Sequence, residues 1–119
     1  MSNMPYMTIG VPVYQGEAFI EETLRSIQDQ THRNIEVIIS LDGPQPASEQ
    51  RCQPFLKDSR FRIVVQPERL GWVGNINWLM AQAETPYWYC NAQDDLVDRC
   101  YVETLLWHTQ QMPAAAVVF

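Results

Sequence analysis

Two adjacent acids, Asp94 and Asp95, follow the apolar run of residues 86–90 and precede a helix-like stretch that begins at Asp98. The run predicts a buried strand, and the carboxyl ends of strands are where open α/β sheets bind ligands. Two neighbouring carboxylates repel each other unless a cation joins them. A divalent ion that carries a diphosphate fits this role, because Mg²⁺ takes one or two carboxylates together with phosphate oxygens. The alternative is that Asp95 or Asp98 caps the following helix.

Tyr14 and Asp42 are further candidates, because each follows a predicted strand. The ring of Tyr14, which lies beside Pro12 and Gly16, can stack on a planar base. Alternatively, this ring packs in a helix interface. The carboxylate of Asp42 can accept a hydrogen bond from a base N–H or a ribose hydroxyl. Alternatively, it forms only a local turn before Gly43.

The segment of residues 69–77 is also unusual, with two glycines and two asparagines near the start of a predicted helix. The glycines let the backbone approach a ligand or pack closely. Asn75 and Asn77 are poor helix-interior residues, so at least one is expected to face a site; capping plus a polar surface is the alternative. No Gly-Lys-Ser/Thr follows the glycines, so the segment is not a P-loop, and the first turn lacks the Gly-x-Gly-x-x-Gly of a dinucleotide site.

The elements that must position these residues alternate between strand and helix. Strands joined by helices of about a dozen residues favour parallel pairing with right-handed crossovers. Nearly continuous apolar strands indicate helices on both faces. We therefore expect a three-layer α/β/α sandwich with a mainly parallel, Rossmann-like sheet, whose carboxyl edge brings Tyr14, Asp42 and the acid pair to one crevice. The predicted strands are 7–13, 35–41, 61–65, 87–91 and 114–119, and the predicted helices are 17–30, 47–56, a helix from Gly71 to the Thr85-Pro86 boundary, and 98–110.

Composition narrows the class of protein. The 119 residues, 46% hydrophobic and 18% charged, predict a single soluble domain over residues 1–119. A net charge of −6 with one lysine argues against nucleic acid as a partner. Cys52, Cys90 and Cys100 lack zinc-ligand spacing and predict reduced thiols. No apolar stretch reaches the ~18 residues of a membrane span, and a cytoplasmic location is expected.

Four segments in consistent order resemble family 2 glycosyltransferases of the GT-A fold. They are residues 11–17 (VPVYQGE), 22–31 (ETLRSIQDQT), 35–43 (IEVIISLDG) and the DXD-like acidic motif 92–95 (AQDD). Each motif is loose, but the ordered set is specific and covers nearly the whole chain. The resemblance implies the N-terminal, nucleotide-binding half of such an enzyme, with the acceptor-binding half absent after Phe119.

The resemblance also implies a nucleotide-diphosphate sugar as donor and Mg²⁺ or Mn²⁺ as cofactor. Tyr14 would stack near the base, and Asp42 would bond the base or ribose. Asp94 would contact the ribose or donor sugar, and Asp95 would ligate the metal, which neutralises charge on the departing diphosphate. Pro12 and Asn75 would line the nucleotide pocket. The general base lies in the half that follows, so the catalytic residue is unknown.

Members of this type invert the anomeric centre and transfer the sugar to an acceptor hydroxyl, here expected in cell-surface polysaccharide biosynthesis. Alone, this chain is expected to bind donor weakly and transfer little. Two positions depart from the family pattern: Leu41 replaces a frequent acid, and Gln93 stands where many members carry Asp. One alternative is a sugar-phosphate nucleotidyltransferase, which needs a Gly-rich basic loop that residues 13–17 lack. The other is a non-catalytic α/β nucleotide-binding or interaction module. Self-association through apolar residues 117–119 is a further expectation.

Overall fold

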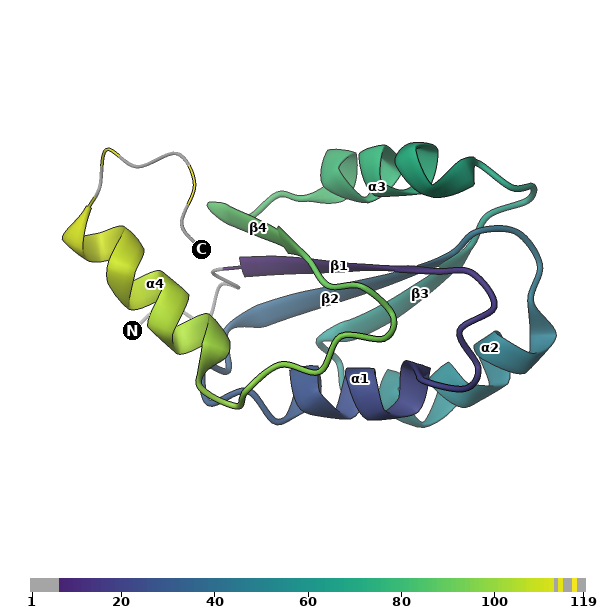
Figure 1. Ribbon diagram of the computed structural model, residues 1–119, viewed down its shortest axis with the longest axis horizontal. Helices are drawn as coiled ribbons and strands as arrows, with labels where there is room; N and C mark the ends of the chain where they lie inside the picture. Colours follow the sequence, from purple (N-terminus) through teal and green to yellow (C-terminus); the bar gives the residue numbers. More distant parts are fainter. Residues whose placement is uncertain (1–6, 113, 115–116, 118–119) are drawn as a thin grey trace.

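The computed structural model describes residues 7–112, 114 and 117. They form a four-stranded sheet in the order β3-β2-β1-β4, and every neighbouring pair of strands is parallel (Figure 1). The predicted parallel α/β sheet is confirmed. In chain order, the elements are β1 (Met7–Val13), α1 (Ile20–Gln28), β2 (Ile35–Leu41), α2 (Pro46–Cys52), the 3₁₀ helix η1 (Gln53–Lys57), β3 (Phe61–Val65), α3 (Gly71–Gln82), β4 (Tyr87–Cys90) and α4 (Tyr101–Gln111).

The order of the strands creates a switch point between β1 and β4. The chain builds outward from β1 through β2 to β3, and α3 then carries it back to the opposite side of β1. Crevices at the carboxyl ends of strands open where the direction of winding reverses in this way. The sheet therefore offers a ligand site beside the last residues of β1 and β4.

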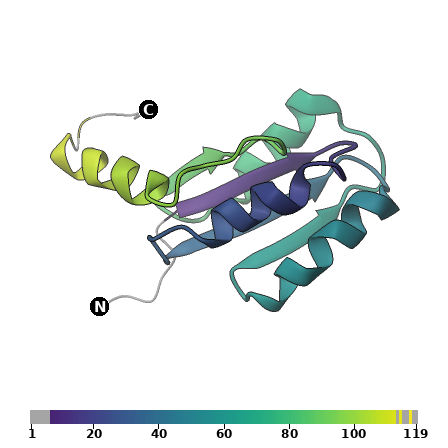
Figure 2. The same ribbon diagram turned by 60° about the horizontal axis from the view of Figure 1, so that its bottom comes forward.

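The helices cover both faces of the sheet, so the three-layer arrangement is as predicted. Helices α1 and α2 lie on one face and α3 on the other, while α4 lies beyond the end of the sheet at which β1 and β2 begin (Figures 1 and 2). Alternating residues of β1 and β2 enter the main core with the apolar stripe of α1. The buried residues of this core include Ile9, Val11, Val13, Val37, Ile39, Leu41, Ile20, Leu24 and Ile27.

The opposite face of β1 is built for close approach. A Cβ added to Gly10 would lie 2.3 and 2.5 Å from two ring atoms of Trp88 and 3.3 Å from the Cβ of Leu79. The indole of β4 therefore lies directly over the glycine, and Leu79 brings α3 close to the same position. A glycine is required here because any side chain would overlap the ring.

The boundaries of all four α-helices differ from the sequence prediction, and three of the differences have a clear cause in the backbone. Helix α1 begins at Ile20, not residue 17, because the Phe19 and Ile20 N–H groups both bond the Gly16 carbonyl in a preceding turn. The helix predicted at 47–56 ends at Cys52 and continues as a 3₁₀ turn that contains Pro54. Helix α4 starts at Tyr101, after a turn at residues 98–101. The strand predicted at 114–119 lies largely outside the described residues.

Candidate functional site

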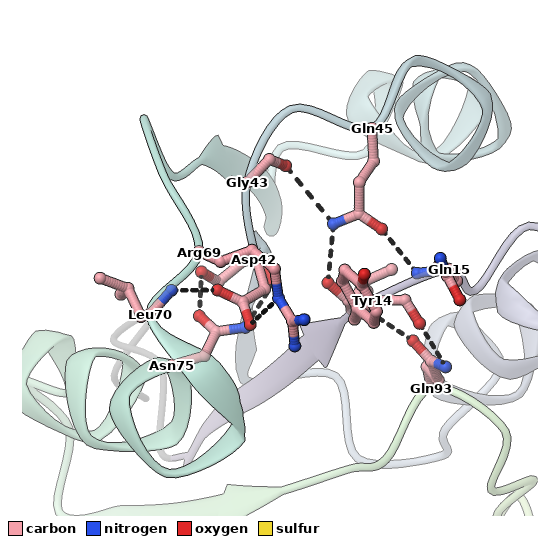
Figure 3. A network of polar contacts seen from close by, with 11 residues as sticks. Tyr14, Gln15, Asp42, Gly43, Gln45, Arg69, Leu70, Asn75 and Gln93 are labelled. Atoms are coloured by element: carbon pink, nitrogen blue, oxygen red, sulfur yellow. Dashed lines mark hydrogen bonds and ion pairs between the residues drawn. The ribbon is translucent and has the colours of Figure 1, made fainter.

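A pocket of about 280 Å³ opens at the switch point, where the strands end. Its walls come from segments that follow each of the four strands, so residues far apart in sequence meet there (Figure 3). It is also lined by Arg69, Trp72 and Gln93. All five residues that the sequence predicts for nucleotide binding line this pocket: Pro12, Tyr14, Asp42, Asn75 and Asp94.

Asp42 is a buried carboxylate that reaches across the end of the sheet. It is only 2% exposed, and its Oδ1 accepts a hydrogen bond of 2.6 Å from the backbone N–H of Leu70, just before α3. The turn after β2 is closed instead by the Gly43 N–H, which bonds the Leu41 carbonyl. The local-turn alternative therefore does not account for the carboxylate, whose Oδ2 keeps hydrogen-bonding capacity toward the pocket.

Arg69 bridges the Tyr14 ring and the Asp42 carboxylate. Its guanidinium carbon lies 3.7 Å from the centre of the ring, and its Nε lies 3.7 Å from Asp42 Oδ2. A planar cation thus lies against an aromatic face while an N–H group is directed at an acid. A nucleobase has the same two features, a flat ring and hydrogen-bond donors on its edge. The Tyr14 ring therefore faces a pocket suited to planar, donor-bearing groups, and the alternative of a ring in a helix interface is not observed.

Asn75 lines the pocket, but its amide is engaged in fixing α3 to the sheet. Its Oδ1 accepts from the Ser40 hydroxyl at 2.6 Å, and its Nδ2 donates to the Ser40 carbonyl at 3.1 Å. Gln66 donates to the same hydroxyl at 3.0 Å, which completes a buried polar network. Asn75 is 2% exposed, so its role in this structure is to set the position of the first turns of α3, which carry Trp72.

Asp94 and Asp95 are both exposed, and they line different pockets. Asp94 faces the switch-point pocket, whereas Asp95 lines a second pocket of about 330 Å³ together with Tyr89 and Tyr101. The expectation that both acids share one crevice with Tyr14 is wrong for Asp95. The reason is a turn in which the Asp95 N–H bonds the Ala92 carbonyl, so that consecutive side chains diverge.

Neither Asp95 nor Asp98 caps helix α4, whose N-cap residue is Cys100 and which has no side-chain cap hydrogen bond. Asp98 Oδ1 accepts from the Cys100 N–H at 2.9 Å in the turn that leads into α4. Helix α4 begins at Tyr101, so Asp95 is too far from its first N–H groups to cap it. The side chain of Asp95 is therefore exposed without a role in starting this helix.

Asp94 and Asp95 are suited only to a cation whose other ligands come from a bound phosphate or from water. Within residues 7–112, 114 and 117, no group of three or more His, Cys, Asp or Glu side chains is gathered around a possible metal position. Mg²⁺ and similar hard ions need no such cage, because they accept one or two carboxylates and complete their shell with phosphate oxygens and water. The donor set is therefore compatible with an ion that arrives with a diphosphate.

Sequence reasoning missed the importance of two glutamines. Gln93 was noted only as a departure from an acidic motif, and Gln45 was not singled out. The structure directs both side-chain amides at the backbone around Tyr14 (Figure 3). No local pattern marks these contacts, since 30 and 79 residues separate the partners in the chain.

The cysteines add no chemistry to the pocket. All three are free thiols, as expected. Burial raises the pKa of Cys52 to about 11 and also raises the pKa of Cys90, so both stay protonated near neutral pH and are poor nucleophiles. Among the helices within the described part of the chain, none has the length and apolar character needed to cross a bilayer.

The sheet order and the pocket define a doubly wound α/β protein with a pocket at its switch point. The chain belongs to glycosyl transferase family 2, because the sequence model of that family matches residues 8–119. The glycosyltransferase GlyG of Streptococcus pneumoniae is 29% identical to it over 113 residues, which make up 94% of this chain and 38% of GlyG. The chain thus spans well under half of this curated relative.

Solved structures share the fold. S. aureus TarS 1-349, determined in complex with UDP-GlcNAc, matches with a TM-score of 0.82 and 18% identity over 88% of this chain and 31% of TarS 1-349. The mannosyltransferase PcManGT from Pyrobaculum calidifontis, determined with GDP-Man and Mn²⁺, matches with a TM-score of 0.76 and 21% identity over 97% of this chain and 34% of that protein. These likenesses support the predicted GT-A architecture.

Proposed function

We propose that this chain is the donor-binding part of a glycosyltransferase that uses a nucleotide-diphosphate sugar. The observation that carries the proposal is the convergence of Tyr14, Asp42 and Asp94, from three separate loops, on one pocket at the switch point. Family membership supports the reaction class, and the structural neighbours were determined with nucleotide sugars. The acceptor site and the general base would lie in the region of the family's longer proteins that this chain does not cover.

In the proposed complex, the base stacks on Tyr14 and takes the place of the Arg69 guanidinium. This exchange is feasible because the Arg69 side chain is 56% exposed and can turn toward solvent. Asp42 then accepts a hydrogen bond from the base or ribose through the oxygen that now faces Arg69. Asp94, which lines the same pocket, contacts the ribose or the donor sugar.

Asp95 would ligate Mg²⁺ or Mn²⁺ by turning its exposed side chain from the second pocket toward the diphosphate. When bound, such an ion neutralises the charge that builds on the leaving diphosphate. The chain's own contribution is to orient the nucleotide and to present exposed acids on a loop held by Asn91, whose Nδ2 donates to the carbonyls of Ala92 and Asp95 at 2.9 and 3.0 Å. Transfer to an acceptor hydroxyl, with inversion at the anomeric carbon, completes the proposed reaction, for which a cytoplasmic site and a role in cell-surface polysaccharide synthesis remain predictions.

Calorimetry with nucleoside diphosphates tests this function directly. We expect either UDP or GDP to bind when Mn²⁺ is present and to bind far more weakly when EDTA replaces it. The uncharged nucleosides uridine and guanosine, which lack the diphosphate, should show no metal dependence. Absence of binding by both diphosphates in the presence of Mn²⁺ would contradict the proposal and favour a non-catalytic interaction module.

Replacing Tyr14 by alanine should weaken binding of the nucleoside diphosphate about fivefold, since a stacked aromatic contact is worth roughly 1 kcal/mol. Tyr14→Phe is the matched control, because it keeps the ring and removes only the hydroxyl, and it should bind within about twofold of the wild type. Isothermal calorimetry measures both, with melting temperatures recorded in parallel. Unchanged affinity in Tyr14→Ala together with a lower melting temperature would instead assign the ring to packing.

A further inference from the structure

The backbone that carries Tyr14 is held by the side-chain amide of Gln93, which comes from the loop after β4 (Figure 3). Gln93 Oε1 accepts from the Tyr14 N–H at 2.8 Å, and Gln93 Nε2 donates to the Tyr14 carbonyl at 3.0 Å. One amide thus satisfies both backbone groups of a single residue, as a neighbouring strand would. β1 ends at Val13, so this contact extends its pairing by one residue beyond the sheet.

Gln45 holds the same stretch of backbone from the other side, at the start of α2. Its Oε1 accepts from the Gln15 N–H at 2.6 Å, and its Nε2 donates to the Val13 carbonyl at 3.1 Å. Gln15 has a φ of 53°, which is uncommon for a residue other than glycine. A conformation of this kind persists when the surroundings over-determine it, and the two amides supply that constraint.

Only an uncharged amide can make the Gln93 contact. The pair of bonds requires one acceptor and one N–H donor on the same side chain, which an ionised Asp or Glu cannot offer because it only accepts. The approach also depends on Gly16, since a Cβ there would lie 2.8 Å from Gln93 Oε1. The contact between Gln93 and the turn of residues 14–16 therefore requires both an amide at residue 93 and a glycine at residue 16.

The backbone of Gln93 is held in turn by helix α1, so the position of its side-chain amide is fixed relative to the sheet. Its carbonyl accepts from the hydroxyl of Thr23 at 2.6 Å, and Thr23 is buried in α1. The residue that follows Gln93 is Asp94, which lines the same pocket as Tyr14 and Arg69. Gln93 thus connects the backbone of Tyr14 to the loop that carries Asp94.

We infer that Gln93 and Gln45 are positioning residues that fix the Tyr14 ring relative to Asp94 for binding of the donor nucleotide. The inference rests on the proposed function for the identity of the ligand. It gives the neutral side chain of Gln93 a role, which is to hold the backbone of the loop that carries Tyr14. Loss of either amide releases Tyr14 while leaving every pocket-lining acid in place.

Hydrogen exchange followed by NMR tests the clamp without any ligand. In Gln93→Ala the Tyr14 N–H should exchange at least about fivefold faster than in the wild type, as expected for loss of one net hydrogen bond. The Gln15 N–H should respond in the same way to Gln45→Ala. Core amides such as that of Ile39 should be unchanged, and Gln53→Ala, which alters an exposed glutamine outside the pocket, is the control. Unaltered Tyr14 exchange in Gln93→Ala would overturn the inference.

A double-mutant cycle tests the effect on binding. Tyr14→Ala is expected to cost about fivefold in the dissociation constant of UDP or GDP with Mn²⁺ in the wild-type background, and less than about twofold in the Gln93→Ala background, because coupled residues are not additive. Equal losses in the two backgrounds would overturn the positioning role. If the wild type binds neither nucleotide, the proposed function fails, and the exchange experiment still decides whether the clamp exists.

Gly16→Ala provides a second route to the same result. The new Cβ would lie 2.8 Å from Gln93 Oε1 and 3.0 Å from Cγ1 of the buried Val13, so the Gln93 amide must move and the Val13 side chain must shift by a few tenths of an ångström. This variant should stay folded and reproduce both the fast Tyr14 exchange and the weakened nucleotide binding of Gln93→Ala. A folded Gly16→Ala protein with wild-type exchange and affinity would contradict the inference.

Discussion

Replacing Asp95 by alanine is expected to weaken Mn²⁺-dependent binding of a nucleoside diphosphate by at least about 100-fold, because even the outer partners of a bound metal contribute 10- to 100-fold. The fold should be unaffected, since Asp95 is exposed and loses only its repulsion with Asp94. Calorimetric titration with UDP or GDP in the presence of Mn²⁺ measures the loss, and thermal unfolding measures stability.

Two further variants serve as controls and show which of the two acids holds the metal. Asp29→Ala removes one exposed negative charge at the end of α1, outside the pocket, and should bind like the wild type. Asp94→Ala probes the acid that lines the switch-point pocket itself. If Asp94→Ala loses metal-dependent binding and Asp95→Ala retains it, the metal is held by Asp94, and the outward direction of Asp95 in the second pocket reflects its orientation in the complex as well.

Gly10→Ala is expected to have the largest effect on stability, lowering the free energy of unfolding by roughly 3 kcal/mol, at the upper end of the usual cost of overpacking a core. The added Cβ would lie 2.3 Å from one atom of the Trp88 ring, so the rigid ring or strand β1 would have to shift. Urea unfolding followed by tryptophan fluorescence provides the measurement.

The matched control is Gly74→Ala within α3. There the new Cβ would lie 3.1 Å from the Cβ of Leu70, a contact that requires a shift of only a few tenths of an ångström, and the helix gains about 0.8–1 kcal/mol from alanine's higher propensity. We expect a net change within about 1 kcal/mol. A second-site change, Trp88→Leu, should recover part of the stability lost in Gly10→Ala. Tolerance of Gly10→Ala by itself would mean that the indole does not lie over β1 as described.

The strands could be predicted closely from sequence because each is a short apolar run between clear breakers. The predicted ranges 7–13, 35–41 and 61–65 coincide with β1, β2 and β3. Helix ends were less predictable because they depend on backbone hydrogen bonds. The Gly16 carbonyl accepts two N–H groups before α1 begins, and no residue type in that turn announces this arrangement.

The pocket was predictable to the extent that it follows from topology. Residues at the carboxyl ends of parallel strands must gather at one edge, which brings Tyr14, Asp42 and Asp94 together. Side-chain direction was not predictable: Asp95 diverges from Asp94 because of the turn at residues 92–95, and Asn75 is engaged by a serine of β2. Contacts made by single amides across long stretches of chain leave no periodic signal in the sequence.

A ligand ring can stack on Tyr14 only by displacing the guanidinium of Arg69, which already lies against that ring. An incoming ring must first break one cation–π contact and one ion pair, which together contribute about 1–2 kcal/mol at a partly exposed site. The measured affinity is then about 5- to 30-fold weaker than it would be if the face of the Tyr14 ring were free. Salt screens the ion pair between Arg69 and Asp42, so moderate ionic strength should make Arg69 easier to displace from the Tyr14 ring. The same screening weakens the attraction of the pocket for phosphate groups.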